Sequence, residues 1–203
     1  MSYLHARNIC HRDIKPANLL LSSGGARLLL CDFGCAEFFN PMENPGGCVL
    51  DTVGTPAYWA PEAVFPEKYA ADLGLDISEN IPSSENIIEN NRKSYSAYEL
   101  DMWSLGVLLF VMLYLKHPFY EEGLSELELF ARIDTVDPLN EAVPEVAQGY
   151  TSDHPSYDEE EVPSVRDVTA EHRAALEGLL QKEPSQRWSI DSLRVHLLGD
   201  NSC

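Results

Sequence analysis

The chain has 203 residues, of which 44% are hydrophobic, and this is enough for one globular unit whose core needs no disulfide support. Its formal charge of −19 argues against nucleic acid as a main partner, because phosphate backbones are bound by clustered Lys and Arg side chains. The five cysteines include no C-x-x-C pair, which argues against both a disulfide framework and a zinc site.

The longest apolar run covers residues 105–115 and is shorter than the roughly 20 residues that a membrane-spanning helix needs. The N-terminus also lacks the charged start and the small-residue cleavage site of a secretory signal. We therefore expect an intracellular protein in the cytoplasm, with the nucleus as the alternative, and no membrane partner.

The first 34 residues predict a β-hairpin between two polar loops. Residues 1–10 have the pattern of the last turns of a helix that leads into a loop. Residues 19–21 and 26–30 are short apolar runs on either side of a Ser-Ser-Gly-Gly turn, which is typical of a hairpin. The hairpin thus joins the loop at 11–18 to the loop at 31–34.

The rest of the chain alternates loops with helices. Residues 32–62 are rich in proline and glycine and predict a long loop. Two acidic stretches predict flexible insertions, which are either solvated surface loops or a field that attracts basic substrates. The fold class expected is mainly α with small β-hairpins, in one unit over residues 1–198 with a tail at 199–203. The predicted helices cover 101–115, 125–133, 170–180 and 190–198, and the predicted insertions cover 66–96 and 137–166.

The two polar loops of the hairpin carry a set of side chains suited to phosphoryl transfer. Asp13, Lys15 and Asn18 lie in the first loop, and Asp32 opens the Asp-Phe-Gly triplet of the second. A carboxylate on a rigid loop can orient a hydroxyl and accept its proton, and a nearby lysine can neutralise phosphoryl oxygens. Amide and carboxylate oxygens are ligands that Mg²⁺ accepts. The pattern predicts transfer of a phosphoryl group from a magnesium-bound nucleotide to a hydroxyl.

Five motifs together resemble the C-terminal lobe of a eukaryotic protein kinase, from about residue 3 to about residue 198. They are HRDIKPAN at 11–18, DFG at 32–34, GTPAYWAPE at 54–62, DMWSLG at 101–106 and EPSQR at 183–187. They occur in the order of the family and at plausible spacings, whereas each motif alone is a weak signal.

The resemblance implies that the cofactors are ATP and Mg²⁺. It implies that Asp13 is the catalytic base, that Lys15 contacts the transferred phosphoryl group, and that Asn18 and Asp32 bind magnesium. Leu20 resembles the residue at the floor of the adenine pocket, although a strand-core leucine is an equally simple interpretation.

The residues at two positions resemble serine/threonine-directed rather than tyrosine-directed kinases. These are Lys15 and Thr55, and they imply a protein substrate that is phosphorylated on Ser or Thr. The 50–62 segment is similar to that of the calcium/calmodulin-dependent kinase kinases and their upstream-kinase relatives.

Further charged residues are expected to hold the site. By resemblance Glu62 pairs with Arg187, and Asp101 binds the backbone of the catalytic loop. Arg12 would grip a phosphate at the position that Asp51 occupies here. Because a carboxylate is already present there, we hypothesise a loop that is partly activated without phosphorylation.

Residues that would belong to a kinase N-terminal lobe, such as a Gly-rich loop and its strand lysine, are not found in the sequence. We therefore expect the C-lobe only, with the N-lobe absent as a missing partner. Two interpretations remain open. The chain is a fragment of a working serine/threonine kinase, or it is a catalytically inactive kinase-like module that binds or scaffolds basic partners.

Overall fold

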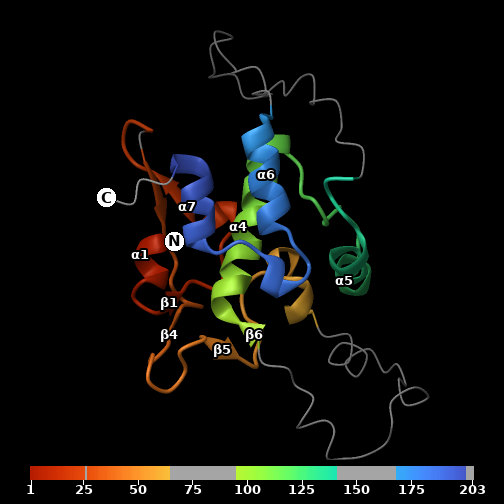
Figure 1. Cartoon of the computed structure of the whole chain (residues 1–203). Coiled ribbons are helices and arrows are strands. Elements are labelled where there is room, and N and C mark those ends of the chain that lie inside the picture. The colour runs from red at the N-terminus through yellow and green to blue at the C-terminus, as the bar shows by residue number, and fades with distance from the viewer. Residues whose placement is uncertain (26, 65–94, 141–167, 200–203) are drawn as a thin grey trace, which may run out of the picture.

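The structure is a computed structural model, and it describes residues 1–25, 27–64, 95–140 and 168–199. Helices dominate the described residues, accompanied by three small two-stranded sheets (Figure 1). The helices are α1 (Ser2–His5), α4 (Ala97–Tyr114), α5 (Glu126–Thr135), α6 (Ala170–Leu179) and α7 (Ile190–Leu198). The strands are β1 (Ile9–Cys10), β2 (Leu19–Leu21), β3 (Leu28–Leu30), β4 (Glu37–Phe38), β5 (Cys48–Val49) and β6 (Tyr95–Ser96). Single 3₁₀ turns occur at Pro16–Asn18, Pro56–Tyr58, Pro61–Ala63 and Pro184–Gln186. The predicted mainly helical class with small hairpins agrees with this content.

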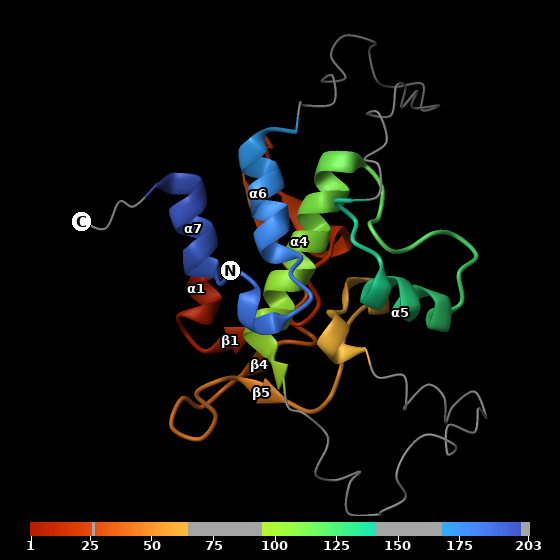
Figure 2. The ribbon, with the colours of Figure 1, turned by 45° about the vertical axis from the view of Figure 1, so that its right-hand side comes forward.

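Helix α4 is the centre of the fold, with α6 packed along it and α1, α5 and α7 around it (Figures 1 and 2). Trp103 and Val107 on α4 are fully buried, and they share one apolar cluster with Phe130 of α5 and Leu176 of α6. Gly106 allows α6 to come close, because a Cβ atom there would lie 2.9 Å from the Cβ of Leu179. The helix predicted over residues 101–115 is thus confirmed, although it starts earlier than expected, and Met112 near its end is 53% exposed.

Helix α4 is long and apolar enough, by length and composition, to cross a membrane. It is the one such helix in the part of the chain that the structure describes, and 56% of its residues are buried by the rest of the fold. The core helix of a folded domain has the same composition. Its packing against α6 and α5 accounts for its apolar surface here.

Side chains at the N-termini of α5 and α6 cap these helices. Ser125 accepts a hydrogen bond from the backbone N–H of Glu128, whose carboxylate accepts from Ser125 N in return, and this capping box starts α5 one residue after the predicted point. Thr169 and His172 form the equivalent box at α6. Helices α6 and α7 match the predicted ranges within one residue.

The β2–β3 hairpin is confirmed, with Leu20 paired to Leu29. Two other strand pairs were not expected, because two-residue strands give no sequence pattern. Strand β1 pairs with β4 inside the predicted 32–62 loop. Strand β5 pairs with β6, where Val49 lies opposite Tyr95 and Tyr95 is buried.

The pairing of β6 corrects the end of the predicted 66–96 insertion, since residues 95 and 96 are in a strand and not in a flexible loop. Of the predicted 137–166 insertion, residues 137–140 form a turn in which Pro138 is buried. The remaining residues of both predicted insertions, together with 200–203 of the tail, lie outside the described residues.

Candidate active site

The loop that carries Asp13 is hydrogen-bonded to the first turns of α4. The carboxylate of Asp101 is fully buried and accepts the backbone N–H groups of His11 and Arg12, each at 2.8 Å. Arg12 has a left-handed backbone with φ of 64°, which a non-glycine residue adopts only where its surroundings enforce it. The hydrogen bonds to Asp101 hold the Arg12 backbone in this conformation. The predicted contact of Asp101 with the backbone of the catalytic loop is thus confirmed.

His5, Cys10 and Asp101 place possible metal-ligating atoms within 4.8 Å of one another. His5 Nε2 lies 3.0 Å from Asp101 Oδ2, and both Asp101 oxygens already accept backbone N–H groups. Burial, reinforced by the charge of Asp101, raises the pKa of the Cys10 thiol well above its ordinary value. The cluster therefore acts as a support for the catalytic loop.

Asp13 is 8% exposed and is surrounded by donors. Its Oδ1 accepts from the backbone N–H of Thr55 at 3.0 Å, and its Oδ2 lies 2.8 Å from the Lys15 ammonium. Burial is the largest influence on the Asp13 pKa and raises it, but the hydrogen bonds from Lys15, Thr55 and Asn18 together outweigh burial and lower the pKa. Asp13 is therefore a carboxylate at neutral pH and can accept a proton.

The Thr55 hydroxyl sits between the two charged groups of the predicted site. It donates to Asp13 Oδ1 at 2.8 Å and accepts from Lys15 Nζ at 2.6 Å. The sequence marked Thr55 only as a sign of substrate type, and the structure adds it to the site. The preceding Gly54 has φ of +88°, and a Cβ atom there would lie 2.4 Å from the Arg12 carbonyl oxygen. Only glycine lets the chain approach this closely.

Asn18 comes from the 3₁₀ turn after Lys15 and is 4% exposed. Its side-chain N–H₂ donates to the Asp13 backbone oxygen at 2.7 Å and to Asp13 Oδ2 at 3.0 Å. Within the described ranges its Oδ1 accepts no hydrogen bond. The amide oxygen is thus the free end of a fixed side chain, which suits a ligand of a hard cation.

Asp32 is joined to the catalytic loop through its backbone neighbour. Cys31 N–H donates to Asn18 O at 2.9 Å, and Cys31 O lies 3.0 Å from His11 Nε2. Asp32 itself has φ of 59° and is exposed, with one carboxylate oxygen accepting from Gly34 N–H at 3.2 Å. The second carboxylate oxygen is open to a cation, so that the donor set at Asn18 and Asp32 fits magnesium.

Leu20 is 53% exposed on β2. The interpretation as a strand-core leucine therefore does not fit the structure, whereas a role at the adenine pocket stays a prediction. Leu20 belongs to an exposed apolar surface on the hairpin, which we call the hairpin surface. It consists of Leu20, Leu21, Leu28 and Leu29, each 49–69% exposed.

Arg12 joins three segments of the chain. Its side chain is 6% exposed and donates to the carboxylate of Glu37 on β4 and, at 2.9 Å, to that of Asp51. The predicted contact with Asp51 is confirmed. Glu37 was not expected, because its position depends on the pairing of β4 with β1.

Glu62 and Arg187 form the predicted ion pair. The two guanidinium nitrogens of Arg187 lie 2.5 and 2.9 Å from the two carboxylate oxygens of Glu62. Arg187 also donates to the backbone oxygens of Gln181 and Glu99, each at 3.0 Å. Its side chain is completely buried, so this pair ties the turn before α7 to the segment that follows the active site.

Comparison with known proteins agrees with this geometry. The family model described as the protein kinase domain matches residues 1–77 and 80–198. The serine/threonine-protein kinase ssp1 of Schizosaccharomyces pombe is 32% identical over 97% of the chain, which covers 23% of that protein. SNF1-activating kinase 1 of Saccharomyces cerevisiae is 32% identical over 97% of the chain, which covers 16% of it. Serine/threonine-protein kinase stk11 of Xenopus laevis is 29% identical over 97% of the chain, which covers 33% of it. The chain thus spans a third or less of these curated relatives and belongs to the protein kinase domain family.

Proposed function

We propose that this chain carries the catalytic groups of an ATP-dependent serine/threonine protein kinase. The observation that carries the proposal is the arrangement of Asp13, Lys15 and Thr55, in which one hydroxyl touches both the carboxylate and the ammonium group. A substrate Ser or Thr hydroxyl presented to the same carboxylate would meet a group able to accept its proton.

In the proposed reaction the substrate hydroxyl oxygen would attack the γ-phosphorus of bound ATP, the bond from that phosphorus to the β–γ bridging oxygen would break so that ADP leaves, and the hydroxyl proton would pass to a carboxylate oxygen of Asp13. Lys15, which is 2.8 Å from Asp13 Oδ2, stabilises negative charge beside the reacting atoms. Asn18 holds Asp13 in place through its two hydrogen bonds. When bound, ATP supplies the phosphoryl group and Mg²⁺ neutralises its charge, with Asn18 and Asp32 as the magnesium ligands and Leu20 as an adenine contact.

We also propose that the described elements are the helical lobe of a kinase domain and that a strand-rich lobe packs on the hairpin surface. Four leucines on two paired strands are each 49–69% exposed, and contiguous exposed apolar side chains mark interaction surfaces. Covering them would also exclude water from one side of the site, which strengthens the electrostatic interactions there.

For partners we propose a protein substrate, with basic segments favoured by the charge of −19. The relative SNF1-activating kinase 1 is by its name a kinase that activates SNF1. A cytoplasmic or nuclear location remains part of the proposal.

The alternative function is a binding module without catalysis, and nucleotide binding discriminates between the two. We expect the purified protein to bind Mg-ATP with a Kd in about the micromolar to millimolar range. Asp32→Asn should weaken binding at least about tenfold when magnesium is present, because a charged ligand of the ion is lost. Isothermal titration calorimetry with and without EDTA measures both values. Binding that is unchanged in Asp32→Asn would contradict the proposed magnesium ligands.

The contact between Arg12 and Asp51 predicts activity without phosphorylation of this segment. Asp51→Asn should lower the rate of phosphoryl transfer about two- to fivefold at low salt, a small factor because Asp51 is 66% exposed and its charge is screened. Asp51→Glu should restore most of the rate.

Glu43→Gln is the matched control, because Glu43 is an exposed acid in the same part of the chain and should leave the rate unchanged. Steady-state rates with a peptide substrate at two salt concentrations decide the question. Equal rates for Asp51→Asn and the unsubstituted protein would rule out the hypothesis of a partly activated loop.

A further inference from the structure

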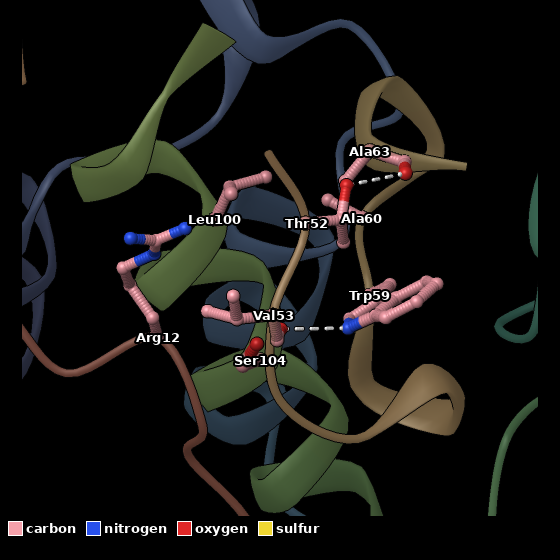
Figure 3. A pocket seen from close by; sticks show the side chains of 8 residues that line it. All are labelled: Arg12, Thr52, Val53, Trp59, Ala60, Ala63, Leu100 and Ser104. Carbon is pink, nitrogen blue, oxygen red and sulfur yellow. Dashed lines mark hydrogen bonds between the residues drawn. The ribbon is translucent and has the colours of Figure 1, made fainter. Parts of the chain in front are cut away.

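Trp59 touches the segment that carries Thr55 from the side opposite Arg12 (Figure 3). Its indole N–H donates to the backbone oxygen of Val53 at 2.9 Å. Its ring stacks on Phe130 of α5 with centroids 5.8 Å apart and an interplanar angle of 9°. One side chain therefore links a helix of the core to the backbone two residues before Thr55.

The Val53 oxygen depends on this donor. No other donor in the described part of the chain reaches it, while the neighbouring Thr52 hydroxyl has its own partners, the Ala63 oxygen at 3.1 Å and the Tyr95 hydroxyl at 2.6 Å. Trp59, Val53 and Arg12 line one small pocket (Figure 3). The peptide after Val53 is thus fixed by the indole on one side.

The position of this peptide matters because the next two residues make the closest contacts in the site. Gly54 lies so near the catalytic loop that an added Cβ would be 3.1 Å from Asp13 Oδ1. Thr55 then places its N–H and its hydroxyl on that same oxygen, at 3.0 and 2.8 Å. A shift of a few tenths of an ångström at Val53 would lengthen or break these two hydrogen bonds.

We infer that Trp59 is a positioning residue, whose indole N–H holds the Val53 peptide so that Thr55 stays bonded to Asp13. Its stacking on Phe130 has a separate role, which is to join α5 to this segment. The inference rests on the proposed function for its meaning in catalysis, but the hydrogen bond itself can be tested without an activity assay.

Two substitutions separate the roles. Trp59→Phe keeps an aromatic ring against Phe130 and removes the N–H donor. Phe130→Leu keeps the donor and removes the stacking. Hydrogen exchange of the Thr55 amide, which donates to Asp13, is measured against the amide of Ile133, a fully buried residue of α5, as the reference for global opening.

For Trp59→Phe we expect protection of the Thr55 amide to fall roughly three- to tenfold relative to Ile133, since one hydrogen bond is lost. Phe130→Leu should lower the melting temperature while leaving that ratio unchanged. In the enzymatic assay Trp59→Phe should lower kcat and leave the KM for Mg-ATP unchanged, because Thr55 is bonded to Asp13 and Lys15 and not to the proposed magnesium ligands Asn18 and Asp32.

An unchanged ratio in Trp59→Phe, or an equal fall in Phe130→Leu, would overturn the inference. The result stays distinct from a failure of the proposed function. If the ratio falls and the protein transfers no phosphate, the positioning role stands and the kinase proposal fails. If phosphate is transferred and the ratio does not move, the positioning role alone fails.

Discussion

Asp13→Asn is expected to lower the rate of phosphoryl transfer by roughly 10²- to 10⁴-fold, the range that general acid–base catalysis contributes. Asparagine fits the same space and can still accept from Thr55, but it cannot take the proton of the substrate hydroxyl. Its neutral side chain also leaves the Lys15 ammonium without its partner at 2.8 Å. Initial rates with a Ser or Thr peptide at saturating Mg-ATP measure the effect.

Asp134→Asn on α5 is the matched control, because Asp134 is an exposed aspartate away from the site and should keep the full rate. Mg-ATP affinity should change little in Asp13→Asn, since the proposed magnesium ligands are Asn18 and Asp32. A variant at Asp13 that keeps more than about a tenth of the rate would show that another group accepts the proton.

Arg187→Met should cost about 3–5 kcal/mol of the free energy of unfolding. The Arg187 side chain is completely buried and holds Glu62 with two hydrogen bonds. Removing it leaves the Glu62 carboxylate and two backbone oxygens of the same region without their donor. Urea denaturation followed by circular dichroism gives the value.

The exposed pair of Arg173 and Glu177, at 3.0 Å on α6, provides the comparison. Arg173→Met should cost about 0.5 kcal/mol or less, because surface pairs are screened. Adding Glu62→Gln to Arg187→Met should recover part of the lost stability, since the unpaired and partly buried charge of Glu62 is then gone. Equal losses for Arg187→Met and Arg173→Met would contradict the account of a buried, structural ion pair.

Side chains that lie close along the chain were predictable from the sequence. Asp13, Lys15 and Asn18 fall within one loop, and in the structure the side chains of Lys15 and Asn18 both contact the carboxylate of Asp13. The central helix was predictable for a similar reason, because a run of apolar residues on all sides specifies a buried helix whatever surrounds it.

Contacts that depend on the path of a long loop were not predictable. Thr55 reaches Asp13 only because Gly54 lets the chain pass close to Arg12. Glu37 contacts Arg12 only because β4 pairs with β1, and each of these strands has only two residues. Pairings this short leave no alternation in the sequence, so their register is set by tertiary packing.

Asp13, Lys15 and Thr55 are proposed to serve the transfer of phosphate to a Ser or Thr hydroxyl. The test gives this chain, joined to the strand-rich lobe that is proposed to cover the hairpin surface, γ-labelled Mg-ATP and three basic peptides that differ only in carrying Ser, Thr or Tyr at the acceptor position. We predict label on the Ser and Thr peptides and none on the Tyr peptide. Label on the Tyr peptide, or Mg-ATP binding without transfer to any of the three, would contradict the claim.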